Sequence, residues 1–299
     1  MNENQMKDMI SQIVSEMIKE KGMGTAELPE AAAGREPEKK ALNIEDDIIP
    51  ELSAVDFRKI NSTPNPANLE EFMRIKEKTS ARIGVWRTGP RARSETYLRF
   101  RADHAAAMDA VFTDVDEELL KEQDLFVVKT KCRDKDEFLT RPDLGAEFDE
   151  ETKNEIKARC TMNPDIQVYF ADGLSSSSIE ANLRDLLPSL KQGLANSGLS
   201  IGTPFFVKYG RVRSMDVIAE TLGAKVTAVC IGERPGLATS ESLSVYMCYG
   251  AHVGINEANR TIVSNIYNGG TNPAEAGAYV AELLVRMAKE KASGIDFKI

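Results

Sequence analysis

Four short polar motifs in the C-terminal half of the chain are its strongest candidates for chemistry. Each follows a run of apolar residues that is typical of a strand: Asp172–Ser178, Tyr209–Val212, Gly232–Gly236 and Asn268–Pro273. Glycines let a backbone approach a ligand closely, and free N–H groups at helix N-termini can meet phosphate or amide oxygens. Each motif alone is ordinary turn chemistry. Ligands collect at the carboxyl ends of parallel strands, however, so the four together predict a ligand cleft.

Other kinds of site are disfavoured by the sequence. Neither G-x-G-x-x-G after the first strand nor G-x-x-x-x-G-K-S/T occurs, which disfavours NAD or ATP binding of the common kind. No G-x-S-x-G surrounds the serines at 175–178, and only His104 and His252 could act as a base, which argues against a hydrolase. Two histidines and no C-x-x-C pair also disfavour a zinc site. We therefore expect no zinc site built from this chain and find no convincing acid–base pair in it.

The elements that position these motifs follow from the hydrophobic pattern. Five runs predict strands: Ile166–Ala171, Pro204–Lys208, Val226–Ile231, Ser244–Cys248 and Arg260–Ile266. Helical patterns occur at Ser178–Ser197, Met215–Leu222 and Pro273–Lys291. Strands alternating with helices predict an α/β fold, with a largely parallel sheet buried on both sides. Ser177 and Glu180 have capping-box spacing, and Pro273 suits a first helical turn.

We expect this sheet domain to span residues 161–299, preceded by a mostly helical region at 43–160. In that region the patterns predict a strand at Leu125–Lys131 and three helices: Leu69–Lys78, Ser94 to about Val111, and Phe148–Cys160. Residues 21–42 are rich in Ala, Glu, Pro, Gly and Lys, a composition typical of a flexible linker.

Residues 1–20 predict an amphipathic helix. Their apolar residues fall on one helical face: Met6, Met9, Ile10, Ile13, Val14, Met17 and Ile18. A secretory signal would need a continuous apolar core instead. The helix could pack on its own domain, but a tethered helix cannot readily bury its stripe locally. We favour docking into a groove on a partner.

Composition sets the class of protein. The 299 residues are 42% apolar and 28% charged, as in soluble globular proteins. The net charge of −9 and the absence of a dense Lys/Arg block make nucleic acid an unexpected partner. No apolar run of transmembrane length occurs, so we expect no membrane association. The cysteines are unpaired in sequence and predict reduced thiols in the cytoplasm: Cys132, Cys160, Cys230 and Cys248.

An ordered set of short strings resembles the small (light) subunit of ethanolamine ammonia-lyase. The strings run from Arg87 to the C-terminus: Arg87–Arg93, Arg99–His104, Leu139–Gly145, Asp172–Ser175, Gly202–Val212, Gly232–Leu237, Ser240–Ser242, Ser264–Asn265 and Gly269–Thr271. Each string is modest, but their order makes the set specific. Before about residue 80 the likeness is only in kind, an amphipathic helix and a variable linker.

The resemblance implies an adenosylcobalamin-dependent enzyme that converts ethanolamine to acetaldehyde and ammonia by a radical rearrangement. A separate large subunit holds the substrate in a barrel, and the small subunit closes over the cobalamin as a Rossmann-like domain. The expected assembly is therefore a hetero-oligomer of large and small subunits. The family also implies a location inside a bacterial ethanolamine-utilisation microcompartment in the cytoplasm. The helix at residues 1–20 would then address the enzyme to the shell.

Carried over by position, the family's cobalamin contacts fall on Val212, Glu233 and Ile262. Val212 and Ile262 can pack on apolar parts of the cofactor or present backbone groups to it. Glu233 can accept from amide N–H or ribose hydroxyl groups, and its charge strengthens such bonds. A structural alternative for Glu233 is an ion pair with Arg234 or Arg211.

The histidines bear on how cobalt would be ligated. Some cobalamin enzymes replace the lower axial base with a histidine in a D-x-H-x-x-G motif, and neither His104 nor His252 lies in one. We therefore expect adenosylcobalamin to bind with its own benzimidazole on cobalt. Two other hypotheses stay open, a non-catalytic scaffold that recruits a partner to the shell and a different small-molecule α/β binder.

Overall fold

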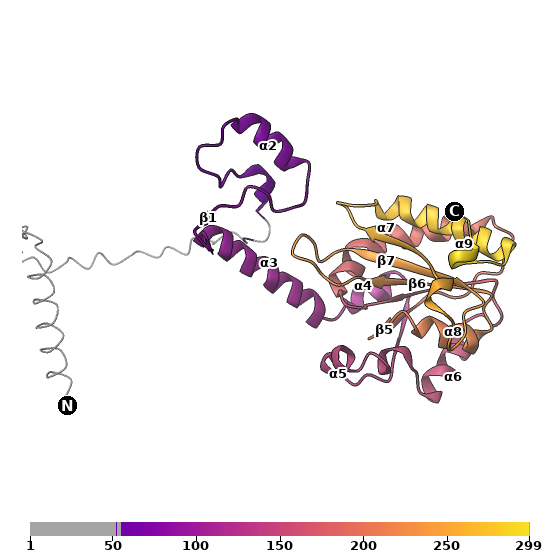
Figure 1. The fold of residues 1–299 in the computed structure, drawn as a ribbon. Helices are drawn as coiled ribbons and strands as arrows, with labels where there is room; N and C mark the ends of the chain where they lie inside the picture. The colour runs from indigo at the N-terminus through magenta and orange to yellow at the C-terminus, as the bar shows by residue number, and fades with distance from the viewer. Residues whose placement is uncertain (1–51, 53–54, 299) are drawn as a thin grey trace, which may run out of the picture. The chain divides into compact units, whose positions relative to one another are not determined.

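The structure, a computed structural model, describes residue 52 and residues 55–298 of the chain (Figure 1). The predicted helix at 1–20 and linker at 21–42 lie outside the described residues. The division at residue 160 stays a prediction, and one strand of the main sheet comes from before it.

A six-stranded sheet forms the centre of the fold, in the order β3-β5-β4-β6-β7-β8. The first four strands in this order run parallel, and β7 and β8 add an antiparallel edge. Their bounds are β3 Phe126–Lys129, β4 Ile166–Ala171, β5 Phe205–Lys208, β6 Val226–Gly232, β7 Leu243–Tyr249 and β8 Thr261–Ile266. The predicted α/β fold with a largely parallel sheet is confirmed. The five strands predicted after residue 160 are present, with ends shifted by one residue at most.

Helices cover both faces of this sheet (Figure 1). α7 (Ser176–Ala195) and α9 (Pro273–Glu290) pack on one face, and α6 (Glu150–Arg159) and α8 (Ser214–Leu222) pack on the other. β4 shows why the sheet needs both layers, because all six of its residues are buried. Val168 and Phe170 point into the α7–α9 core, whereas Tyr169 points into the α6–α8 core, as the two-residue period of a strand requires.

The region before residue 125 is mainly helical in its described part. Its helices are α2 (Leu69–Glu77), α3 (Ser94–Phe112) and α4 (Glu117–Glu122), and a short hairpin joins β1 (Arg87–Thr88) to β2 (Arg91–Ala92). A further helix, α5 (Lys135–Thr140), and a single 3₁₀ turn at Leu144–Ala146 follow β3. None of the described helices is long and apolar enough to span a membrane.

The start of α7 corrects one prediction. The N-cap is Ser175, whose side chain accepts from the backbone N–H of Ser178, so the capping box of Ser177 and Glu180 is wrong. Glu180 instead accepts from the backbone N–H of Asp116 at 3.0 Å. Ser175 takes the cap because it alone of the four serines has extended backbone angles, while the next three are already helical. Pro273 does lie in the first turn of α9.

The strand registers bring the predicted motifs to one edge of the sheet. Ala171 pairs with Val207 and Ile231, so β4, β5 and β6 end together. Leu243 pairs with Gly232 on one side and Ile266 on the other, which places the start of β7 and the end of β8 at the same edge. The motifs that follow these strands therefore share one rim, as the sequence predicted.

Candidate functional site

A cleft of about 400 Å³ lies at this rim, on the face of the sheet that carries α6 and α8. We call it the rim cleft. Its lining comes from three of the four motifs and from β6, β7 and β8: Gly173, Leu174, Arg211, Val212, Ile231, Gly232, Glu233, Arg234, Ser244, Tyr246, Ile262 and Ser264. Val212, Glu233 and Ile262, which are far apart in sequence, are thus brought together in one cleft. The motif Asn268–Pro273 does not line it.

The turn that presents Val212 is built on a buried carboxylate. Asp172, at 1% exposure, accepts the backbone N–H groups of Tyr209 at 3.0 Å and Gly210 at 3.1 Å. Tyr209 has a φ of 60°, a left-handed conformation that is rare for a large side chain. The two hydrogen bonds that Asp172 accepts offset the energetic cost of this backbone conformation. Asp172 therefore fixes the path of the chain from the end of β5 to Val212.

Lys135, from α5, neutralises this carboxylate. Its amine lies 3.2 Å from Asp172 Oδ2, and both side chains are buried. Burial raises the pKa of the Asp172 carboxyl, against the lowering effects of Lys135 and the two backbone N–H groups. The same amine lies over the rings of Phe138 and Tyr209, at 5.5 and 5.3 Å from their centroids. A charged pair and two aromatic rings thus hold the base of the turn.

Arg211 is one of two arginines that line the rim cleft, with Arg234. Its guanidinium stacks at 4.0 Å over the Phe138 ring and donates through Nη2 to the Phe138 carbonyl at 2.7 Å. Gly145 makes room for this side chain, because a Cβ at that position would lie 2.6 Å from Arg211 Cγ. Burial lowers the pKa of Arg211, and its Nε is buried without a hydrogen-bond partner. Arg211 therefore brings a positive charge to the cleft, and among the described residues no carboxylate pairs with it.

Glu233 follows β6 and is held by three donors. Its Oε1 accepts from Ser244 Oγ at 2.5 Å and from the backbone N–H of Asn265 at 3.1 Å, and its Oε2 accepts from Ser242 Oγ at 2.9 Å. Burial acts to raise the pKa of Glu233, but these bonds outweigh it and the pKa is lowered. The structural alternative is wrong, since neither Arg211 nor Arg234 pairs with Glu233 in the described part of the chain. An ionised carboxylate thus faces the cleft.

Ile262 lies in β8, where it pairs in register with Tyr246 of β7. Both side chains lie on the face of the sheet that α6 and α8 cover. These helices do not cover Ile262, which is 48% exposed. An exposed isoleucine beside a half-buried tyrosine gives the cleft an apolar wall. The rim cleft therefore combines an apolar surface with one carboxylate, Glu233, and two arginines, Arg211 and Arg234.

A family model for the ethanolamine ammonia-lyase light chain (EutC) matches residues 69–298. The chain belongs to this family. Curated relatives named ethanolamine ammonia-lyase small subunit include one from Listeria innocua, 50% identical over 300 residues and covering all of both chains. Another, from Clostridium tetani, is 48% identical over 298 residues, covering 100% of this chain and 99% of the relative. The resemblance predicted from the ordered strings is confirmed.

Within this light-chain family member, several residues of the site were not predicted from sequence. Asp172 and Arg211 stood in recognised motifs, but their contacts with Lys135 and Phe138 depend on how α5 packs. Ser244 and Tyr246 could have been found from the alternation of β7, which places both on the face of the strand opposite Val245.

The cysteines and histidines of this family member lie outside the rim cleft. All four cysteines are buried and free, as predicted, and burial raises the pKa of Cys160 to about 11. His104 is exposed on α3, and His252 is exposed after β7. Within the described residues, no three His, Cys, Asp or Glu side chains are grouped as a metal site would need.

Proposed function

We propose that this chain is the small subunit of an adenosylcobalamin-dependent ethanolamine ammonia-lyase, and that the rim cleft holds part of the cobalamin against a large subunit. The names of the relatives support the assignment to an ethanolamine ammonia-lyase. The observation that carries the cofactor site is the convergence of Val212, Glu233 and Ile262 on one cleft. Such a convergence of an apolar wall with a few polar groups is typical of cofactor sites.

The residues of the rim cleft suit cobalamin chemically. A corrin ring presents apolar faces and an edge rich in amide side chains. Val212, Tyr246 and Ile262 give the apolar surface. The ionised Glu233 can accept from amide N–H or ribose hydroxyl groups, and the guanidinium of Arg211 can donate to amide or phosphate oxygens. Cobalamin is larger than this cleft, so the remaining wall comes from the large subunit.

The division of labour follows from what the cleft contains. Adenosylcobalamin supplies the radical chemistry when its cobalt–carbon bond breaks, and protein supplies orientation and exclusion of water. Among the residues that the structure describes, Glu233 is the only carboxylate that lines the rim cleft, and its oxygens already accept from three donors. The cleft therefore offers no pair of groups for acid–base catalysis. This chain therefore binds and orients the cofactor, and the conversion of ethanolamine takes place in the large subunit.

The positions of the histidines support binding with the cofactor's own benzimidazole on cobalt. Neither His104 nor His252 lines the rim cleft. Neither histidine of this chain would therefore replace the cofactor's own benzimidazole as the ligand of cobalt. The microcompartment location and the role of residues 1–20 as a shell-targeting helix are part of the same proposal.

Reconstitution tests this function directly. The chain, a cognate large subunit, adenosylcobalamin and ethanolamine should together yield acetaldehyde, and omission of the chain should abolish turnover. A scaffold or an unrelated α/β binder would leave turnover unchanged on omission. In the same complex, electron paramagnetic resonance should show coupling of cobalt to the benzimidazole nitrogen. Coupling to a histidine nitrogen would contradict the proposed ligation.

A further inference from the structure

Helix α3 exposes an apolar surface that no described residue covers. Five large apolar side chains of this helix are between 43% and 55% exposed: Tyr97, Leu98, Phe100, Met108 and Phe112. We call them the α3 apolar face. At 3.6 residues per turn they fall within an arc of about 160°, interrupted only by Arg101 and His104 among titratable residues.

The opposite side of α3 is already packed against its own chain. Asp103 and Ala110 are buried there, at 6% and 4% exposure. The packed side is thus occupied by contacts within the chain, including the ion pairs of Asp103 with Arg82 and Arg99. The α3 apolar face lies on the other side of the helix, where it is free to meet a partner.

The area of this face fits a stable interface. Five side chains of about 200 Å² each, roughly half exposed, present on the order of 500 Å². This is the size of the largest apolar patch on a typical soluble chain, and such patches are often functional. A standard interface buries about 800 Å² per partner, so this face would supply most of the apolar core of one.

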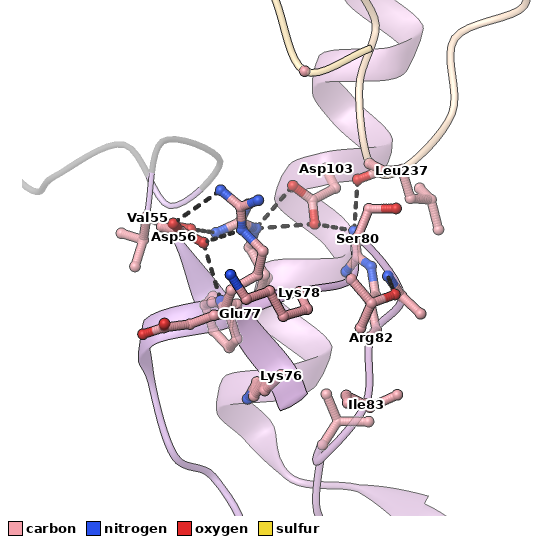
Figure 2. Close-up of a pocket in the computed structure, with 18 of the residues that line it drawn as sticks. Val55, Asp56, Lys76, Glu77, Lys78, Ser80, Arg82, Ile83, Asp103 and Leu237 are labelled. Carbon is pink, nitrogen blue, oxygen red and sulfur yellow. Dashed lines mark hydrogen bonds and ion pairs between the residues drawn. The ribbon is translucent and has the colours of Figure 1, made fainter. Parts of the chain in front are cut away.

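The packed side of α3 connects it to the rim cleft. Figure 2 shows Arg82 between Asp103 of α3 and the carbonyl of Leu237. Arg82 pairs with Asp103 and donates to the Leu237 oxygen at 2.7 Å, while Arg99 also donates to Asp103 at 2.8 Å. Leu237 lies in the loop between β6 and β7, which starts at Glu233. The guanidinium of Arg82 thus links α3 to the loop that carries Glu233.

We propose that the large subunit docks on the α3 apolar face. The inference rests on the proposed function, in which a second chain closes the rim cleft. The chain that closes the cleft meets the loop between β6 and β7, and the Arg82–Asp103 contact holds α3 beside that loop. One partner therefore covers both surfaces, and docking on α3 positions it over the cofactor.

Two matched methionines test the docking surface. Met108 on α3 is 47% exposed, and Met162, in the loop before β4 at the opposite edge of the sheet, is 44% exposed. Met108→Glu should weaken the affinity of the full chain for the large subunit about tenfold or more, because a charge is buried in an apolar contact. Met162→Glu should leave that affinity unchanged. Sedimentation velocity gives the affinity, and circular dichroism confirms that both variants are folded.

Turnover in the same samples separates this inference from the proposed function. At saturating large subunit, Met108→Glu should recover wild-type turnover, because Met108 lies outside the rim cleft. Wild-type affinity of Met108→Glu, with turnover intact, would overturn the docking surface and leave the proposed function standing. No complex with the wild-type chain would overturn both. A change only in self-association of the isolated chain would show that the occupant is a second copy, and would also overturn the proposal.

Discussion

Glu233 is the residue on which the proposed site depends most. Its carboxylate keeps its charge inside the rim cleft because two serine hydroxyls and one backbone N–H donate to it. Neutral donors stabilise the ionised form and leave its negative charge in place. A paired arginine would instead neutralise that charge. The side chain can therefore still act as a charged acceptor toward a ligand.

We expect Glu233→Ala to weaken binding of adenosylcobalamin to the subunit complex by about 1–3 kcal/mol, or roughly 5- to 150-fold, through loss of a charged acceptor. An absorbance titration of the cofactor measures the affinity. Glu241→Ala is the control, since Glu241 lies exposed in the same loop and outside the cleft. Equal affinities for the wild type and Glu233→Ala, with the complex intact, would remove Glu233 from the site.

The lowered pKa of Glu233 gives this prediction a pH dependence. A carboxyl whose pKa is depressed below its ordinary value of 4.5 stays ionised throughout the neutral range. Its contribution to binding is present above that value and is lost as pH falls through the lowered pKa. Cofactor affinity should thus not change through Glu233 between about pH 6 and pH 8. Glu233→Gln should remove any loss of affinity at acid pH that the wild type shows.

At the scale of elements, the pair of Asp172 and Lys135 joins three of them. The carboxylate at the end of β4 holds the turn after β5, and the amine comes from α5. Both side chains are buried, so the pair is balanced only while both charges are present. This junction sets the distance between the Val212 turn and the rest of the rim.

Asp172→Asn should therefore cost about 3–5 kcal/mol of unfolding free energy, because it leaves the Lys135 charge buried and unpaired. Urea denaturation followed by circular dichroism measures the loss. The double variant Asp172→Asn with Lys135→Met removes both charges and should recover a large part of the stability. If the double variant were as unstable as the single one, the ion pair would not be the source of the loss.

The sheet was predictable because its strands are short, mostly apolar runs rich in β-branched and aromatic residues, as β4 and β6 show. The short helices α4 and α5 were not, since six residues are too few to show a helical period. The cap of α7 was misplaced because four consecutive serines offer equivalent hydroxyls, and only the backbone angles select Ser175. The three hydrogen bonds to Glu233 depend on the antiparallel pairing of β6, β7 and β8, which the local sequence pattern does not specify.

At the scale of the whole molecule, the described part of the chain holds one wall of a site. Its rim cleft is lined by apolar and charged groups suited to a large cofactor, and α3 presents an uncovered apolar face. Both features fit the proposed function, in which the subunit works in a complex. Residues 1–20, outside the described part, carry the amphipathic sequence pattern that we propose for targeting.

That assignment predicts separable effects on catalysis and location. Deleting residues 1–20 should leave turnover of the subunit complex unchanged, since the rim cleft and α3 lie within residues 94–264. The same deletion should abolish co-sedimentation of the complex with microcompartment shells, because the apolar stripe that docks in a groove is gone. Ile13→Asp on the stripe should act like the deletion, whereas Ser11→Asp on the polar face should co-sediment normally. Loss of turnover in the truncated complex would show instead that residues 1–20 belong to the working enzyme, and equal co-sedimentation of Ile13→Asp and the wild type would refute the targeting role.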